Sequence, residues 1–158
     1  MKTIKFFPLI ALIFLYSCSK ENVQLGSKYF NNDVNELLDE WIVVSFVEYS
    51  NNDTFLEIPY DDMHQCKVMF SNYKNDSCDI SFNYVNELYS VCYFTDNNEL
   101  TINNQWGGTE VYDSTGWEEK IVNALNSVSK WIIKDKQLYL LFKTDGTTKY
   151  NALCLQRD

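Results

Sequence analysis

The chain has 158 residues, of which 46% are hydrophobic and 16% aromatic, enough apolar material for one packed domain. Only 2 prolines and 5 glycines occur, which argues against a disordered chain. The formal net charge is -9, and removing the two lysines of the leader, which has no acidic residue, leaves -11. Such an acidic domain repels a phosphate backbone, so we expect no nucleic-acid partner.

The first 17 residues are typical of a secretory leader. A basic start at residues 1–5 precedes an apolar run of 11 residues, Phe6 to Tyr16. This run is too short to span a bilayer, which takes about 20 helical residues, but it has the length of a signal-peptide apolar region. It ends in Leu15-Tyr16-Ser17-Cys18, which resembles the lipobox of bacterial lipoproteins. An ordinary signal peptide with a chance cysteine is the alternative.

The lipobox resemblance implies that residues 1–17 are removed and that Cys18 is acylated. Each buried methylene contributes about 0.8 kcal/mol, so two or three acyl chains anchor a protein stably. Residues 18–33 are then the lipidated N-terminus and a tether without apolar periodicity. We expect a lipid-anchored protein of the bacterial cell envelope, in the outer membrane, and leave its periplasmic or surface orientation open.

Residues 34–158 are predicted to form one mainly β domain. β-branched and aromatic runs separated by turn residues predict an antiparallel meander that forms a small open barrel. One amphipathic helix, at about residues 115–130, is expected to pack on it. The strands are predicted at residues 41–49, 54–58, 65–70, 77–84, 88–95, 99–103, 131–134, 137–142 and 149–156.

The predicted helix is the element around which the strands should close. Thr115 and Glu118 fit a capping box at its start. Its apolar residues recur at helical spacing and should be buried as one stripe. The stripe comprises Trp117, Ile121, Ala124, Leu125, Val128 and Ile132. We expect this stripe to plug the barrel and to leave no large interior pocket.

The last third of the chain resembles the META domain, also called HslJ-like. That family has a strand, a threonine-bearing loop, a helix and a hairpin of aliphatic residues around a polar turn. The matching residues are Leu100 to Ile102, Thr109, Ala124-Leu125, Val128, Ile133 and Leu138-Tyr139-Leu140. The family's opening Leu-x-Gly-x-Trp is similar to Leu37 to Trp41, with Asp39 in place of glycine.

The META resemblance implies a compact antiparallel β domain with one helix, found in envelope lipoproteins linked to stress or drug tolerance. It supplies no catalytic residues. Two family segments differ here: the Gly-Cys-Asn-Asn segment corresponds to residues 83–86, and Met-Ala-Cys to residues 111–113. The paired cysteines implied by those family motifs are therefore absent at these places. The resemblance covers about residues 37 to 156.

Four cysteines follow Cys18, namely Cys66, Cys78, Cys92 and Cys154. An even number in an oxidising compartment makes them candidates for two disulfides, with three connectivities. Approximate hairpin registers place the first three on one apolar face. The competing interpretation is that all four are buried thiols that act as small hydrophobic residues.

The sequence offers little reactive chemistry. His64 is the only histidine, and its partner Cys66 would lie two residues along a strand, too far for a tight catalytic pair. The nearby acidic residues lack the closed ligand set of a zinc site, so we expect neither a metal nor another cofactor. We predict that the protein is not an enzyme.

Aromatic residues offer a candidate binding surface, chiefly Trp106 and Tyr112, because tryptophan and tyrosine are enriched at binding sites. Ordinary half-buried packing is the alternative. Two functions stay open besides a weaker enzymatic one. The first is a monomeric, non-catalytic structural or protein-interaction lipoprotein, and the second is a lipocalin-like binder of a small apolar ligand or glycan. A carrier needs an interior cavity of about 300 Å³ or more.

Overall fold

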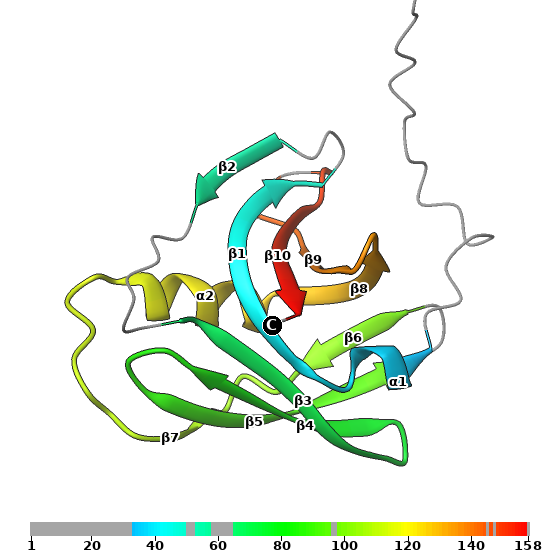
Figure 1. Ribbon diagram of the computed structural model, residues 1–158, viewed down its shortest axis with the longest axis horizontal. Helices are drawn as coiled ribbons and strands as arrows, with labels where there is room; N and C mark the ends of the chain where they lie inside the picture. The colour runs from blue at the N-terminus through cyan, green and yellow to red at the C-terminus, as the bar shows by residue number, and fades with distance from the viewer. Residues whose placement is uncertain are drawn as a thin grey trace, which may run out of the picture.

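The computed structural model describes residues 33–49, 53–57, 65–95, 98–144, 146 and 148–157. They form a closed antiparallel barrel with two helices (Figure 1). The elements are α1 (Val34–Leu37), β1 (Glu40–Glu48), β2 (Asp53–Glu57), β3 (Lys67–Lys74), β4 (Ser77–Asn83), β5 (Glu87–Thr95), β6 (Glu99–Ile102), β7 (Gly107–Gly108), α2 (Trp117–Asn126), β8 (Val128–Lys134), β9 (Gln137–Phe142) and β10 (Asn151–Arg157). Within these ranges, no helix is long and apolar enough to cross a membrane.

The barrel closes because β1 pairs on both of its sides. Around the barrel the strands follow the order β1, β3, β4, β5, β6, β8, β9 and β10, and β10 pairs with β1 again. The short strands β2 and β7 add to β1 and β5, respectively. The predicted small antiparallel barrel with one amphipathic helix is therefore confirmed, except that the barrel was expected to be open and pairing of β1 with β10 closes it.

Two tight turns explain how the longer hairpins reverse. Asn75 and Asp76 between β3 and β4 both have positive φ, at 53° and 57°. Asp135 and Lys136 between β8 and β9 have 54° and 68°. Two successive residues with positive φ are the type I′ arrangement, whose twist matches that of the strands it joins.

The two halves of the barrel differ in what they bury. On β9, Leu138, Leu140 and Phe142 enter the interior, whereas Tyr139 and Leu141 belong to a second apolar cluster on the opposite face. β10 alternates in the same way, so these strands are near-continuous apolar runs. In contrast, β3, β4 and β5 alternate apolar residues inside with mainly polar residues and tyrosines outside, where Met69 and Val91 are the apolar exceptions.

Large side chains fill the barrel interior. Trp41, Phe82, Leu100 and Leu140 are 0% exposed and belong to one cluster. A side chain with no accessible surface has no water-sized space beside it, and the packing is dense at these positions. Moreover, each fully buried side-chain nitrogen or oxygen of the described residues has a hydrogen-bond partner.

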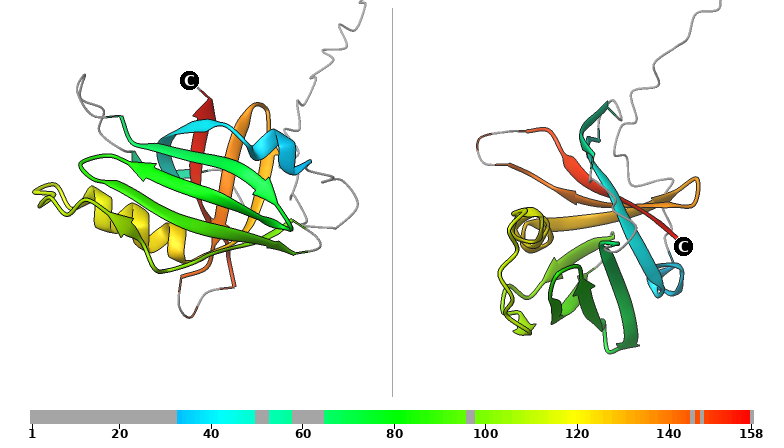
Figure 2. Two further views of the ribbon diagram at one scale, coloured as in Figure 1. Left: turned by 90° about the horizontal axis from the view of Figure 1, so that it is seen from below. Right: turned by 60° about the vertical axis from the view of Figure 1, so that its left-hand side comes forward.

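Helix α2 lies where the two halves of the barrel part, between β8 and the strands β3 to β6 (Figure 2). There the register of β6 and β8, over the described residues, is the single pair Glu99 and Lys130. Ile121, Ala124 and Leu125 enter the interior cluster, whereas Trp117 is half-buried at its margin. The helix therefore fills the barrel with three residues, fewer than the six of the predicted apolar stripe.

The helix is shorter than the predicted 115–130, because it ends at Asn126. The Ser127 backbone N–H bonds the carbonyls of Ala124 and Leu125, and its hydroxyl donates to the carbonyl of Asn123. Val128 then starts β8 opposite Phe142. Pairing with β9 overrides the helical spacing of Val128 and Ile132, which are buried as strand residues instead.

Candidate functional site

Asn86 is the centre of a buried polar cluster between β4 and β5. Its side chain is 4% exposed although it lies in a short connection. The Val111 backbone N–H donates to Asn86 Oδ1 at 2.6 Å, and Asn86 Nδ2 donates to the Val111 carbonyl at 2.9 Å. The amide therefore pairs with both backbone groups of Val111, much as a neighbouring strand would, and fixes the loop that contains it.

Glu118 ties the same asparagine to α2. The Asn86 backbone N–H donates to Glu118 Oε2 at 2.9 Å, and Asn86 Nδ2 donates to Oε1 at 2.5 Å. The predicted capping box is wrong, because Glu118 is turned toward Asn86 and Gly116, at φ 70°, occupies the N-cap. Burial, and then the charge of Glu118, raise the pKa of the Cys66 thiol.

Asp113 supplies the missing cap from three residues before Gly116. Its carboxylate accepts hydrogen bonds from the backbone N–H groups of Thr115, at 2.8 Å, and Glu118, at 2.9 Å. The Thr115 hydroxyl also donates to it at 2.6 Å. Desolvation raises the pKa of Asp113, but these hydrogen bonds outweigh it and leave the pKa below its ordinary value. A carboxylate at the start of a helix also interacts favourably with the helix dipole.

The other end of the loop is attached to β5. Thr109 accepts from the Glu87 backbone N–H through its hydroxyl, at 3.1 Å, and donates its own N–H to the Glu87 carbonyl at 3.2 Å. Gly108 approaches so closely that a Cβ there would collide with the Glu87 carbonyl, and its φ of 149° suits glycine. Residues 109 to 113 are thus held at both ends.

The side chains of Val111 and Tyr112 project from this fixed loop, and we call these two residues the tip. Val111 is 59% exposed and Tyr112 is 88% exposed, the highest value among the large hydrophobic residues of the described ranges. The buried Asn86 thus fixes, through its hydrogen bonds, the loop from which the mostly exposed Tyr112 projects. Rigid presentation lowers the ordering cost of binding, and tyrosine is enriched among residues that dominate binding energy.

Trp106, the other residue of the predicted aromatic surface, lies differently. It is half-buried against the interior cluster, and its indole N–H donates to Asn126 Oδ1 at 2.8 Å. Trp106 therefore joins the segment before β7 to the end of α2. Sequence reasoning identified Tyr112 but not its supports, because Asn86 lies 25 residues before Val111 and 32 residues before Glu118 in the chain.

The four predicted disulfide candidates are all buried. The Sγ atoms of Cys78 and Cys92 lie 2.6 Å apart, and the hydrogen bond between them, followed by burial, raises the pKa of Cys92. Cys66 lies in the interior cluster, whereas Cys154 lies in the second cluster on the outer face of β10. Protonated, buried thiols are poor nucleophiles.

The remaining predicted residues fall outside the described ranges. These include the leader, Cys18 and its tether, and His64. Among the described residues, no group of three or more His, Cys, Asp or Glu side chains could hold a metal ion.

Comparisons with known proteins bear on the fold alone. No family model matches the chain, and a search of curated proteins found no match. Among solved structures, the chain is similar to a DUF4847 family protein from Bacteroides vulgatus, with a TM-score of 0.51 and 17% sequence identity. The match covers 80% of this chain and 98% of that one. At this identity the likeness supports a shared barrel architecture.

Proposed function

We propose that the protein is a lipid-anchored envelope lipoprotein with a META-like domain, and that it binds a partner protein through the Val111–Tyr112 tip. The anchor is the acylated Cys18, and the role is non-catalytic, in keeping with the stress tolerance linked to META proteins. The supporting observation is that Asn86, 4% exposed, holds both backbone groups of Val111 beside the 88% exposed Tyr112.

The tip suits a protein partner for a physical reason. Exposing a large aromatic ring to water forgoes the roughly 1.5–3 kcal/mol that burial of such a side chain contributes. That contribution is recovered when a partner surface covers the tip. Tyrosine suits such a contact because it offers an apolar ring and a hydroxyl.

The packed interior favours this role over that of a lipocalin-like carrier. Residues from both halves of the barrel, including Trp41, Phe82 and Leu140, are 0% exposed, and α2 adds Ile121 and Leu125 to the same cluster. A carrier would need an interior cavity of about 300 Å³ or more where these side chains meet. A ligand at that place would have to displace them.

Capture from the envelope tests the proposal. Full-length protein, acylated and carrying a C-terminal affinity tag, is purified from gently solubilised membranes as wild type, Tyr112→Ser and Tyr93→Ser. Tyr93 is the matched control because it is a tyrosine 49% exposed on β5. We expect a protein that co-purifies with wild type and Tyr93→Ser and is lost with Tyr112→Ser. Recovery of the same co-purifying protein in equal amounts with wild type, Tyr112→Ser and Tyr93→Ser would contradict the role of the tip.

The anchor is tested separately. Cys18→Ala should move the protein from the membrane fraction to the soluble fraction, whereas Cys66→Ala, which alters a cysteine inside the barrel, should leave it membrane-bound. Retention of Cys18→Ala after a carbonate wash would show that acylation of Cys18 is not the anchor.

A further inference from the structure

The outer face of β3, β4 and β5 carries a trough whose origin is the register of the three strands. Met69 lies opposite Ser81, and Ser81 lies opposite Tyr89, so a small residue sits between two large ones. The next outward row is Ser71, Asp79 and Val91. The walls on β3 and β5 are about 9.5 Å apart, twice the spacing of neighbouring strands.

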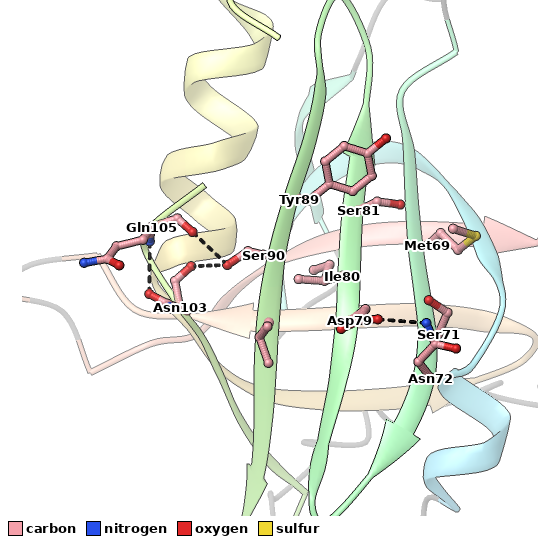
Figure 3. A pocket seen from close by; sticks show the side chains of 11 residues that line it. Met69, Ser71, Asn72, Asp79, Ile80, Ser81, Tyr89, Ser90, Asn103 and Gln105 are labelled. Atoms are coloured by element: carbon pink, nitrogen blue, oxygen red, sulfur yellow. Dashed lines mark hydrogen bonds between the residues drawn. The ribbon is translucent and has the colours of Figure 1, made fainter. Parts of the chain in front are cut away.

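The trough has a volume of about 550 Å³. Figure 3 shows Ser81 and Asp79 on its floor, Met69 and Ser71 along one side, and the Tyr89 ring at one end of the other side. Asn103 and Gln105 border it beyond β5. The volume lies within the range of about 300 to 1,000 Å³ found for small-molecule pockets, although this hollow is open to solvent on the outer face.

The segment beyond β5 is shaped to form this border. β5 pairs with β6 at one end and with β7 at the other, and residues 103–106 leave the sheet between them. The Ser90 hydroxyl donates to the Asn103 carbonyl at 2.7 Å and contacts that of Gln105 at 3.2 Å. Asn103 Oδ1 in turn accepts from the Gln105 backbone N–H at 3.1 Å. These bonds fix residues 103–106 and hold Gln105 beside the trough.

Two further contacts pre-position the lining. Asn72 Nδ2 donates to Asp79 Oδ2 at 2.8 Å, which orients the carboxylate on the floor. Interaction with the Glu87 carboxylate, chiefly hydrogen bonding, raises the pKa of Tyr89. Tyr89 and Met69 nonetheless remain 49% and 41% exposed. An exposed ring and thioether thus face a floor of hydroxyl and carboxylate groups.

We propose that this trough binds a neutral sugar ring, with Tyr89 and Met69 against its C–H face and Asp79 accepting hydrogen bonds from its hydroxyls. A sugar ring has one apolar face and a rim of hydroxyl groups that both donate and accept. The lining matches this, because hydroxyl and amide groups do both and a carboxylate accepts strongly.

The charge of the lining selects against other ligand classes. Among the described residues that line the trough, Asp79 is the only carboxylate, and none of them is a lysine, arginine or histidine. A phosphate, sulfate or uronic acid would therefore meet a like charge without a counter-charge. A wholly apolar ligand would bury the Asp79 carboxylate and the serine hydroxyls without partners, which is costly.

The sugar site is independent of the proposed partner-binding tip, because neither Val111 nor Tyr112 lines the trough. A variant that alters Tyr89 should leave partner capture through Tyr112 unchanged. Likewise, Tyr112→Ser should leave sugar binding unchanged. The two proposals can therefore fail separately.

Glycan-array binding of the purified full-length protein tests the sugar site. The protein is kept in lauryldimethylamine oxide, since detergents with sugar headgroups would compete. The array carries neutral oligosaccharides of glucose, mannose, galactose and xylose beside sulfated and uronic-acid glycans. We expect wild type to bind one or more neutral glycans in preference to the anionic ones. The best neutral oligosaccharide is then titrated calorimetrically.

Three variants locate the site. Tyr89→Ala should weaken the affinity about tenfold through loss of the ring contact. Ser81→Tyr should abolish binding, because the ring of the introduced tyrosine would fill the trough. Tyrosine is favoured at exposed strand positions, so the fold should be kept. Tyr93→Ala is the control, since Tyr93 is equally exposed on the same face of β5 but does not line the trough. Circular dichroism confirms that each variant is folded.

The proposal is overturned if wild type binds no neutral glycan on the array. Equal preference for anionic glycans, or neutral-glycan binding unchanged in both Tyr89→Ala and Ser81→Tyr, would also overturn it. Loss in those two variants with retention in Tyr93→Ala would establish the trough as the site.

Discussion

The Sγ atoms of Cys78 and Cys92 lie 2.6 Å apart, and the two residues face each other directly on β4 and β5. The Phe94 N–H bonds the Asp76 carbonyl two positions along, so the cysteines occupy a hydrogen-bonded pair of the ladder. Such pairs have Cα atoms about 5.5 Å apart, within the range that a disulfide spans. Among the cysteine pairs left open by the sequence, this geometry favours Cys78–Cys92 alone, because Cys66 and Cys154 belong to different clusters.

We therefore predict that an oxidising envelope joins Cys78 to Cys92. A disulfide oxidant such as oxidised glutathione accepts the two electrons, and both thiol protons are released. Intact mass should fall by two hydrogen atoms, and peptide mapping should recover one cross-link, with Cys66 and Cys154 alkylated only after denaturation. A cross-link that includes Cys66 or Cys154 would contradict the assignment.

Removal of the Asn86 side chain should loosen the tip. Asn86→Ala leaves both backbone groups of Val111 and the Glu118 carboxylate without their buried partner, at a cost of about 1–3 kcal/mol in the free energy of unfolding. Urea unfolding measures the loss, and hydrogen exchange at the Val111 N–H should accelerate. Asn83→Ala is the control, because Asn83 is an exposed asparagine at the end of β4, just before the connection that contains Asn86.

Truncation of Leu125 tests the packed interior. Leu125 is 0% exposed in the cluster that α2 completes, so Leu125→Ala should lower the free energy of unfolding by about 2–5 kcal/mol. Glu119→Ala, at an exposed position of the same helix, should change it little. Similar values for the two variants would mean that the helix does not plug the barrel, and the carrier function would then regain support.

Acid should loosen the start of α2 through Asp113. Hydrogen bonds from Thr115 and Glu118 leave the pKa of Asp113 below its ordinary value of 3.8 in the folded protein. A carboxyl group with a depressed folded pKa contributes stability above its unfolded pKa, and that stability is lost as the pH falls through the folded value. The melting temperature of wild type should therefore fall below about pH 4 more steeply than that of Asp113→Asn. Parallel pH profiles would rule out this contribution.

The fold was accessible from the sequence where local signals agree. Alternation along β3 to β5 and polar turn residues at 71–76 and 135–136 sufficed to predict antiparallel hairpins, although β3 continues to Lys74 and the first turn is only Asn75-Asp76. Approximate registers also placed Cys66, Cys78 and Cys92 on the inner face, which the structure confirms. These features depend on neighbours along the chain, so a sequence pattern can record them.

The site was not accessible in the same way. Asn86 meets Val111 and Glu118 across 25 and 32 residues, and nothing in their spacing indicates contact. The end of the helix was missed because Val128 fits the helical stripe but gains a strand partner in Phe142. The outer trough depends on which residues of three strands share a row. A shift of one residue would turn Ser81 and Tyr89 inward.

Photo-crosslinking in living cells tests the central claim most directly. A photoreactive amino acid replaces Tyr112 in the full-length lipoprotein and, in a parallel strain, the exposed control Tyr93. Irradiation should yield one discrete cross-linked envelope protein from position 112, and Asn86→Ala should reduce its yield because the tip is no longer held. The absence of an adduct at position 112, or the same adduct from both positions, would contradict a partner-binding tip.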